Sequence, residues 1–393
     1  MDNTTEKLLA GQISTPGYVF DIDAFGKRVS LVKKAFGSRT KLCFSIKANP
    51  FLLKYLPEEF DKIEVCSPGE LTICEKIGAD MKKIIFSGVN KTKSDVERAM
   101  NDGVGIFTAE SLLHLQYINE SALKRGITVP VLLRLTAGSQ FGMDKTDVLD
   151  IIDNRVKYQN IEIKGLHFFS GTQKKKATVI EKELDRLMAF IDEVAHDHQF
   201  LLERLEYGTG LAVDYFTAEA EELEIFRLEA VSGKVREVAQ KIDLTIEMGR
   251  FFAAPCGYYF TTVMDVKHND GVNYAIVDGG LNQLKYDGQI QGMQIPNILH
   301  VQKVGSPEVP EQAWTLCGSL CTTADVLARN VSLCALSPGD ILIFERTGAY
   351  SVTEGMALFL SRELPEVNVY SAKDGLVRIR SIMDASQFNT SLV

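Results

Sequence analysis

The sequence predicts an α/β chain made of a (β/α)8 barrel of the TIM type, followed by an all-β domain with a sandwich or Greek-key arrangement. Between residues 42 and 250, eight short runs of β-branched and apolar residues recur, and stretches with helical periodicity separate them. Eight strands that alternate with helices over about 210 residues suit the lower size range of such a barrel. After residue 255, strands follow one another without long helices between them, which predicts the all-β domain.

Each expected barrel strand is short and mostly apolar. The eight runs lie at 42–47, 63–66, 83–88, 105–109, 129–135, 163–171, 202–208 and 244–250. Two of the expected helices, 181–195 and 218–240, are long and amphipathic. A shorter helix is expected near Ser94, which has capping-box spacing to Glu97, and Gly103 is expected to end it.

The β-domain is expected to begin with two strands within residues 257–280, joined by a turn at Asn269, Asp270 and Gly271. Further strands are expected within 314–321, 340–351 and 376–382. The initial run 17–23 is expected to join this domain. The predicted domains are therefore residues 24–255 for the barrel, and residues 1–23 with 256–393 for the β-domain.

Composition and charge restrict the function. The formal net charge of −9 argues against a nucleic-acid partner, because binding phosphates requires clustered Lys and Arg. No apolar run is long enough to span a bilayer, and the first residues lack the features of a signal peptide. Seven scattered cysteines suit a reducing cytoplasm. No metal is expected, since Cys317 and Cys321 have no second ligand pair.

Polar residues follow the expected barrel strands, at the ends where such barrels carry their chemistry. Because the eight strand ends meet at one mouth, these residues are expected to form a ring there. They are Lys47, Cys66 with Ser67, Ser87 with Gly88, Glu110, Arg134, residues 170–172, residues 208–210 and residues 247–250.

Three of these positions together indicate pyridoxal 5'-phosphate. Lys47 closes a buried strand, where a charged amine is costly unless its chemistry is used. The alternative is a lysine that has just reached solvent at the strand's end. The glycine loop 208–210 and the pair Gly249–Arg250 suit a phosphate, although the loop alone is also typical of a tight turn. Glu247 is then placed to keep the cofactor's ring nitrogen protonated. The alternative for Glu247 is an ion pair with Arg250.

Seven motifs together resemble those of the fold-type III pyridoxal phosphate decarboxylases, the family of diaminopimelate, ornithine and arginine decarboxylases. The resemblance covers nearly the whole chain. The motifs are SIKANP (45–50), VCSPGEL (65–71), GLHFFSGTQ (165–173), YGTGLAVDYF (207–216), EMGR (247–250), CGSLCTTADVLA (317–328) and GAY (348–350).

The resemblance implies a role for each matching residue. Lys47 forms the Schiff base with pyridoxal phosphate, and Glu247 faces the ring nitrogen. Cys321 enters the active site of the other subunit of a homodimer and protonates the substrate's Cα, so that each site is composite. Substrate contacts are expected from Thr322, Tyr286 and Asp325. Further cofactor contacts are expected from Ser67, Arg134, Phe169, Thr172, Gly208, Thr209, Gly210, Gly249, Arg250 and Tyr350.

Several departures from the family pattern concern the substrate. Phe169 replaces the usual stacking histidine, and His167 is then interpreted as a barrel residue rather than a catalyst. Thr322 replaces the acid that holds a distal ammonium group in diaminopimelate and ornithine decarboxylases. Gln140 replaces a lysine that pairs with the residue matching Asp325, Glu64 stands where many relatives have Asp, and residues 281–288 lack an arginine used by diaminopimelate decarboxylases.

The expected function is therefore decarboxylation of an amino acid or an amino-acid-derived biosynthetic intermediate, giving an amine and carbon dioxide. The substrate is a small molecule, free or tethered to a carrier protein, and no nucleic-acid or membrane partner is expected. Three alternatives remain: a diaminopimelate or ornithine/lysine decarboxylase proper, an enzyme similar to alanine racemase, and a non-catalytic homologue that acts as a binding protein. Glu247 argues against the racemase, and the complete cofactor set argues against the binding protein.

Overall fold

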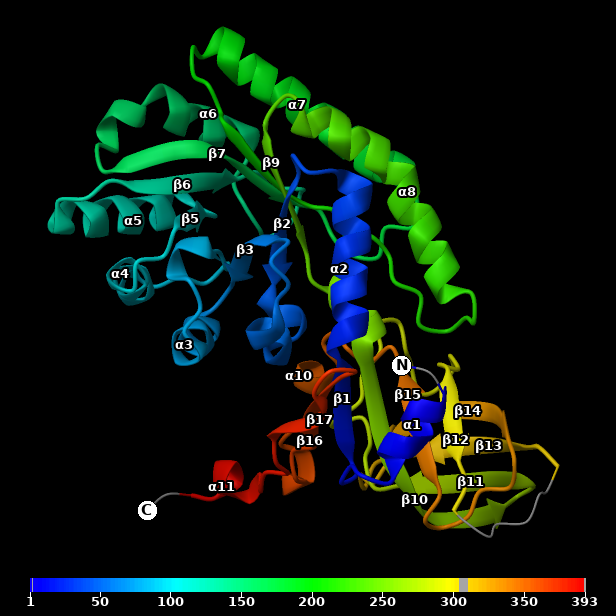
Figure 1. Cartoon of the computed structure of the whole chain (residues 1–393). Coiled ribbons are helices and arrows are strands. Elements are labelled where there is room, and N and C mark those ends of the chain that lie inside the picture. Colours follow the sequence, from blue (N-terminus) through cyan, green and yellow to red (C-terminus); the bar gives the residue numbers. More distant parts are fainter. Residues whose placement is uncertain (2, 304–309, 392–393) are drawn as a thin grey trace. The chain divides into compact units, whose positions relative to one another are not determined.

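The computed structural model describes residues 1, 3–303 and 310–391 (Figure 1). The chain forms two compact units. The barrel unit comprises Arg28–Ala212 and Glu222–Phe251, and the β-unit comprises Met1–Lys27, Val213–Glu221 and Phe252–Val393. Residues 24–27, 213–221 and 252–255, which lie inside the range expected for the barrel, group with the β-unit.

The barrel unit contains a closed barrel of eight strands in sequence order. Every neighbouring pair is parallel, including the closing pair of the first and last strands. All eight expected strands are confirmed. They are β2 (Lys41–Ser45), β3 (Phe60–Val65), β4 (Ile84–Phe86), β5 (Ile106–Ala109), β6 (Val129–Arg134), β7 (Ile161–Phe169), β8 (Arg204–Gly208) and β9 (Asp243–Met248).

Helices cover the outside of this barrel, as Figure 1 shows for the long pair α7 and α8. In α7 the residues Ile180, Leu184, Leu187 and Ile191 are buried at helical spacing, so one apolar stripe packs on the strands. The helices are α2 (Ile22–Phe36), α3 (Pro68–Ile77), α4 (Lys93–Asn101), α5 (Leu112–Arg125), α6 (Lys145–Asp153), α7 (Ala177–Asp197), α8 (Ala220–Ala239) and α9 (Arg250–Ala253). Short 3-10 turns are η1 (Ile46–Ala48), η2 (Pro50–Tyr55), η3 (Met81–Lys83), η4 (Arg155–Lys157) and η5 (Ala254–Cys256).

The expected capping box of α4 is wrong by two residues. Thr92 is the N-cap, and its hydroxyl accepts a hydrogen bond from the Asp95 N–H at 3.2 Å. The Asp95 carboxylate in turn accepts from the Thr92 N–H at 2.9 Å. Ser94 and Glu97 lie inside the helix. Gly103 follows the helix end at Asn101 and has a φ of 78°.

The β-unit contains one nine-stranded sheet, whose longest path runs β14–β13–β11–β10–β1–β16–β17. The N-terminal strand β1 (Gly17–Asp21) lies inside this sheet, antiparallel to β10 (Gly257–Asn269) and parallel to β16 (Glu366–Ser371). The expected turn at 269–271 joins β10 to β11 (Val272–Val277). The other strands are β12 (Ile298–Val301), β13 (Gln312–Cys317), β14 (Val326–Leu333), β15 (Ile341–Glu345) and β17 (Gly375–Arg380).

Three strands of this sheet, β12, β14 and β16, were not expected from the sequence. The β-unit also carries α1 (Asn3–Ala10), α10 (Ser351–Glu354), the turn η6 (Phe359–Ser361) and α11 (Ser386–Asn389). The predicted fold class, a (β/α)8 barrel followed by a mainly β domain that takes the N-terminal strand, is confirmed.

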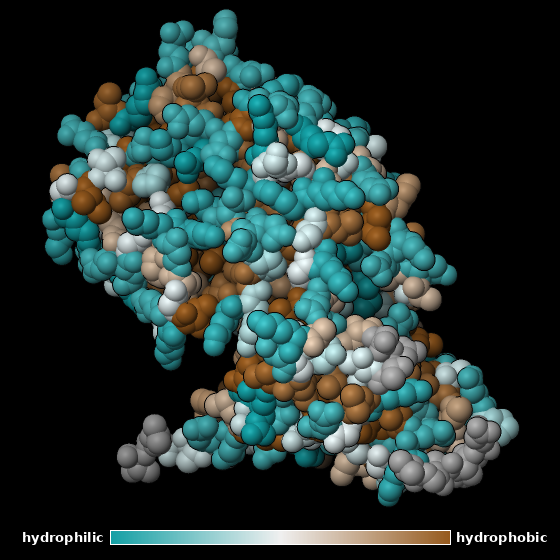
Figure 2. Space-filling view, viewed as in Figure 1, coloured by the Kyte–Doolittle hydropathy of each residue, from teal (hydrophilic) through white to brown (hydrophobic). Residues whose placement is uncertain are grey.

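The face of the barrel unit seen in Figure 2 is largely hydrophilic, with apolar side chains in small groups. Among the described residues, no helix combines the length and the apolar character that a membrane span requires.

We expect Gly165→Ala to destabilise the barrel unit by about 1–3 kcal/mol, the usual cost of overpacking. Gly165 lies on β7, and a Cβ there would overlap the carbonyl oxygen of Arg204 on β8. Gly233→Ala on α8 is the matched control, because no atom lies within 4 Å of its added Cβ. The free energy of unfolding of the control should rise by about 0.5–1 kcal/mol, because alanine has a higher helix propensity than glycine. Urea unfolding measures the stability of both variants. If Gly165→Ala left the free energy of unfolding unchanged, the close spacing of β7 and β8 at this position would be contradicted.

Candidate active site

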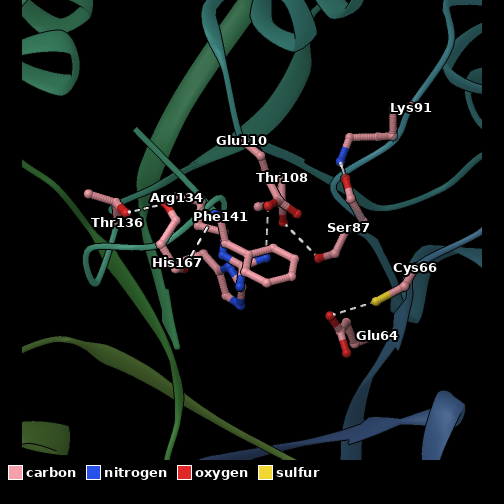
Figure 3. Close-up of polar contacts among 12 residues, drawn as sticks. Glu64, Cys66, Ser87, Lys91, Thr108, Glu110, Arg134, Thr136, Phe141 and His167 are labelled. Atoms are coloured by element: carbon pink, nitrogen blue, oxygen red, sulfur yellow. Dashed lines mark hydrogen bonds and ion pairs between the residues drawn. The ribbon is translucent and has the colours of Figure 1, made fainter. Parts of the chain in front are cut away.

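A cavity of about 590 Å³ lies in the barrel unit and is lined from the carboxyl ends of its strands. Five of the expected site residues line it: Lys47, Ser67, Arg134, Phe169 and Glu247. The lining also includes Cys66, which was expected in the ring at the barrel mouth, and three residues that were not assigned to the site from the sequence: Glu64, Phe141 and His167. Figure 3 shows how part of this set converges from different strands.

Lys47 lies one turn beyond the end of β2, in η1, where its neighbours Ile46 and Ala48 are buried. Its side chain is 38% exposed and its Nζ donates to Glu64 Oε2 at 2.7 Å. The same nitrogen lies 3.9 Å from Glu247 Oε1 and 3.4 Å from Cys66 Sγ. The amine therefore sits between two carboxylates, at a position that a ligand in the cavity can reach.

Glu247, on β9, is buried and well supplied with partners. Oε1 accepts from the Ser45 hydroxyl at 2.9 Å, and Oε2 lies 3.0 Å from His167 Nε2. Burial alone raises the pKa of this carboxyl, but the hydrogen bond with His167 and the charge of Lys47 outweigh burial and hold the pKa well below its usual range. Glu247 is therefore an anion, which suits a protonated ring nitrogen.

Glu206, on β8, has the opposite ionisation. It is buried, and burial raises the pKa of its carboxyl well above the usual value, with further increases from the charges of Glu247 and Glu64. Atoms of His167, Glu206 and Glu247 lie within 4.8 Å of one another, a spacing that a metal ion also requires.

Arg134 is held on two sides at the end of β6. Its Nη1 lies 2.9 Å from Glu110 Oε2, and its guanidinium lies 4.8 Å from the centre of the Phe141 ring (Figure 3). The chain reaches Phe141 through a loop that returns to β6, where Met143 N–H donates to the Arg134 carbonyl at 2.8 Å. This packing keeps both side chains on the cavity wall.

The expected phosphate loop packs on the end of β7. A Cβ on Gly208 would lie 2.5 Å from the Phe169 ring, and one on Gly210, whose φ is 61°, would overlap the Gly171 carbonyl. Glycine is therefore required at both positions. Thr209 is buried, and its hydroxyl accepts from the Leu211 N–H at 3.3 Å. Thr172 is exposed in the loop after β7.

Two further expected residues lie after β9. Gly249 follows the strand, and a Cβ there would lie 2.7 Å from Ala48 Cβ, beside Lys47. Arg250 begins α9. Ser67, by contrast, has a structural contact, because its hydroxyl caps α3 by accepting from the Glu70 N–H at 3.1 Å.

The remaining expected residues belong to the β-unit. Cys321 is exposed, and Tyr350 precedes α10 with a φ of 66°. The buried Asp325 carboxylate accepts from the N–H groups of Leu281 and Leu320, each at 2.8 Å. Tyr286 donates to the Glu345 carbonyl at 2.6 Å. The Thr322 hydroxyl accepts from the Ala324 N–H at 3.3 Å. Roles of these residues toward a substrate stay predictions.

His167, Glu64 and Glu206 are site residues that the sequence reasoning missed or set aside. His167 is indeed buried in the barrel, but it also lines the cavity and contacts Glu247. A signal was available, since Glu206 lies two residues before Gly208 and His167 two residues before Phe169. Because residues two apart on a strand point to the same side, this spacing indicates that both side chains point inward.

We expect Glu206→Gln to gain stability relative to the wild type as pH rises above 4.5, the usual pKa of this group. Above that pH the unfolded wild type releases the proton while the folded protein keeps it, so its free energy of unfolding falls. The glutamine variant has no such proton. Urea unfolding of both proteins between pH 5 and 9 measures the difference.

The exposed Glu222→Gln on α8 is the control. A plot of its free energy of unfolding against pH should run parallel to that of the wild type. If the plot for Glu206→Gln also ran parallel to that of the wild type, Glu206 would be ionised in the folded protein.

Comparison with known proteins identifies the family. The family described as pyridoxal-dependent decarboxylase, pyridoxal binding domain, matches residues 22–254. The diaminopimelate decarboxylase of Neisseria meningitidis serogroup B is 25% identical over 97% of this chain and 94% of its own. The L-glutamyl-[BtrI acyl-carrier protein] decarboxylase of Niallia circulans is 27% identical over 99% of this chain and 97% of its own.

A third relative, the 2-[(L-alanin-3-ylcarbamoyl)methyl]-2-hydroxybutanedioate decarboxylase of Staphylococcus aureus, is 27% identical over 92% of this chain and 95% of its own. Among solved structures, the diaminopimelate decarboxylase of M. jannaschii in complex with L-lysine has the same fold. Its TM-score is 0.85 at 22% identity, covering 99% of this chain and 94% of that one.

The cavity fits the cofactor that this family name implies. An accessible amine, an ionised carboxylate and an aromatic ring share one wall, and two glycine-dependent close contacts lie at the adjoining loop. These are the groups that a pyridoxal aldehyde, its ring nitrogen, its ring face and its phosphate require. The family match covers more than half of the chain. The chain therefore belongs to the pyridoxal-dependent decarboxylases, enzymes that remove a carboxylate from an amino acid with pyridoxal phosphate as cofactor.

Proposed function

We propose that this decarboxylase acts on an amino-acid-derived biosynthetic intermediate whose distal end carries no ammonium group. The observation that carries this proposal is the lack of a spare acid around the site. Among the described residues that line the cavity, the acids are Glu64 and Glu247. Glu64 pairs with Lys47, and Glu247 accepts from Ser45 beside the same lysine. The more distal lining is neutral, with Val89, Asn90, Ser139, Ser170 and Gly171. Thr322 is neutral at the position where the resemblance places an acid.

Relatives with such substrates support this choice. The Niallia circulans and Staphylococcus aureus enzymes are named for a carrier-bound glutamyl group and for a substituted hydroxybutanedioate. Overall identity does not discriminate, because relatives named diaminopimelate decarboxylases are also 25–28% identical. The side chains around the site therefore carry the argument. A buried ammonium without its acid would lose about 2–5 kcal/mol of binding.

The chain's own residues would divide the work around the cofactor, which supplies an electron sink when bound. Lys47 would hold the aldehyde carbon, with Glu64 as its nearby proton acceptor at 2.7 Å. The ionised Glu247 would keep a proton on the ring nitrogen, which argues against a racemase of the alanine type. Phe169 would pack against the ring. Thr172, the 208–210 loop, Gly249, Arg250 and Tyr350 would hold the phosphate, with Ser67 and Arg134 on the surrounding wall.

Assembly and location belong to the same proposal. We infer a homodimer in which Cys321 of one subunit serves the site of the other and donates a proton to the substrate's Cα. The exposed thiol of Cys321 supports this role. We also propose a cytoplasmic location, which suits the seven cysteines of the sequence. A carrier-bound substrate remains one form of the proposed intermediate.

Lys47→Ala should abolish decarboxylation, because no other amine among the lining residues can hold the cofactor aldehyde. The measurement is carbon dioxide release by purified protein with pyridoxal phosphate. The exposed Lys54→Ala is the matched control and should retain wild-type turnover. Full activity of Lys47→Ala would refute the assignment of the reactive lysine.

The substrate proposal predicts turnover of a glutamyl thioester and little turnover of diaminopimelate, ornithine, lysine or arginine. Free glutamate completes the panel. Thr322→Asp should then raise the ratio of diamino acid to thioester turnover by about tenfold or more, because it restores a partner for the distal ammonium. Thr323→Asp, which adds the same charge at the next, exposed position, is the control.

Efficient turnover of a free diamino acid by the wild type would contradict the inference from Thr322. Tight pyridoxal phosphate binding without turnover of any substrate in the panel would instead favour the non-catalytic reading.

A further inference from the structure

The carboxylate of Glu183, on α7, lies outside the cavity lining but receives three side-chain hydrogen bonds. Ser170 donates through its hydroxyl at 2.5 Å, Tyr207 through its phenol at 2.6 Å and Lys174 through its ammonium at 2.7 Å. The Glu183 and Lys174 side chains are 13% and 9% exposed. Three donors on one shielded carboxylate are more than a surface ion pair requires.

The charges in this cluster are well defined. Burial raises the pKa of Glu183, but the hydrogen bonds from Lys174, Ser170 and Tyr207 outweigh it and lower the pKa below its usual value. Burial and the bond to Glu183 together raise the pKa of Tyr207, so the phenol keeps its proton and donates. Glu183 is therefore an anion that accepts all three bonds.

The three donors come from the two segments that border the proposed phosphate site. Ser170 and Lys174 belong to the loop after β7, and Tyr207 is the residue before Gly208 at the end of β8. Backbone bonds join the same segments, from Lys174 N–H to the Gly210 carbonyl at 2.8 Å and from Ala212 N–H to the Lys174 carbonyl at 3.2 Å. Glu183 thus ties both loops to one helix.

These contacts reach the cavity wall itself. Ser170 and Gly171 line the cavity, and Gly210 packs closely on the Gly171 carbonyl. The rings of Phe168 and Tyr207 stack with centroids 6.4 Å apart, which restricts the Tyr207 side chain further. If Glu183 lost its charge, one of its two oxygen positions would become a donor, and the bonds from Ser170, Lys174 and Tyr207 could no longer all be made to an anion. The spacing of the two loops would then depend more on the backbone bonds and on the contact of the Lys174 ammonium with the Tyr207 ring.

We propose that Glu183 is a positioning residue that fixes the 170–174 and 208–212 segments in the geometry needed to bind the cofactor's phosphate. The inference rests on the proposed function, which places the phosphate at these loops. It concerns the phosphate end of the site. At the reactive end, Lys47 lies in η1 after β2, and Glu64 and Glu247 lie on β3 and β9, whereas Glu183 lies on α7.

The test compares a ligand with the phosphate to one without it. Equilibrium dialysis of the full-length apoprotein measures the dissociation constants of pyridoxal phosphate and of pyridoxal. For Glu183→Gln we expect the constant for pyridoxal phosphate to rise about tenfold, the effect of losing hydrogen bonds to a charged group. The constant for pyridoxal should not change. Glu181→Gln, on the same helix, is the matched control and should change neither constant.

A second variant guards against a folding defect. Tyr207→Phe removes one of the three donors and keeps the packed ring, so it should shift pyridoxal phosphate affinity in the same direction by a smaller factor. If Glu183→Gln weakened the binding of pyridoxal phosphate and of pyridoxal equally, its role would be generally structural and the proposal would be overturned. Unchanged pyridoxal phosphate affinity in both variants would also overturn it.

The wild type separates this proposal from the one on which it rests. If the wild type binds pyridoxal phosphate no more tightly than pyridoxal, the placement of the phosphate at these loops is wrong and both proposals fall. If the wild type prefers pyridoxal phosphate and the variants keep that preference, only the role of Glu183 is refuted. Neither measurement needs a substrate, so an error in the proposed substrate leaves the test intact.

Discussion

The ion pair between Lys47 and Glu64 at the mouth of the barrel is the interaction on which the site depends. Two unit charges about 4 Å apart interact by about 4 kcal/mol at an effective dielectric constant of 20. The Lys47 amine is closer than that to Glu64 and lies 3.9 Å from Glu247. The charges of Glu64, Glu206 and Glu247 act around this single lysine, and the pKa values of Glu206 and Glu247 shift in opposite directions. Glu247 remains an anion because Ser45 and His167 support it, and Glu206 takes the neutral form because burial and its neighbours' charges disfavour ionisation.

That division of charge suits the chemistry of the family. A cofactor ring that must accept electrons needs a protonated nitrogen, and an ionised carboxylate facing the nitrogen keeps it so. The same cavity offers a reachable amine on another strand. Barrel closure brings these groups together, since β2 pairs with β9 along the register Cys43–Glu247. The reactive end of the site is thus formed at the ends of the first, second and last strands of the barrel.

The proposed phosphate end has a different kind of support. Its loops follow β7 and β8, and their conformation depends on glycines that allow close packing and on the carboxylate of Glu183 behind them. Gly249 and Arg250 directly follow the strand of Glu247, whereas the loops after β7 and β8 are far in the chain from Lys47. The proposed binding of the phosphate at those two loops and the proposed chemistry at the amine therefore depend largely on different residues. Under the proposed function, substrate choice is a third property, for which the neutral residues of the barrel unit's cavity wall are the candidates. Sequence identity over the whole chain averages over phosphate binding, chemistry at the amine and substrate choice. It therefore cannot rank candidate substrates.

Some of this architecture follows from the sequence by itself. Strand and helix periodicities predicted all eight barrel strands, and five expected site residues line one cavity, because strand ends are local features and a barrel gathers them at one face. The sequence alone could not assign the helix cap between Thr92 and Ser94, since both hydroxyls are local candidates and the geometry of the turn selects one. Nor could it reveal the ionisation of Glu206 and Glu247 or the three donors on Glu183. Those depend on distances between side chains that lie far apart in the chain, and on burial, and both arise only when the barrel closes.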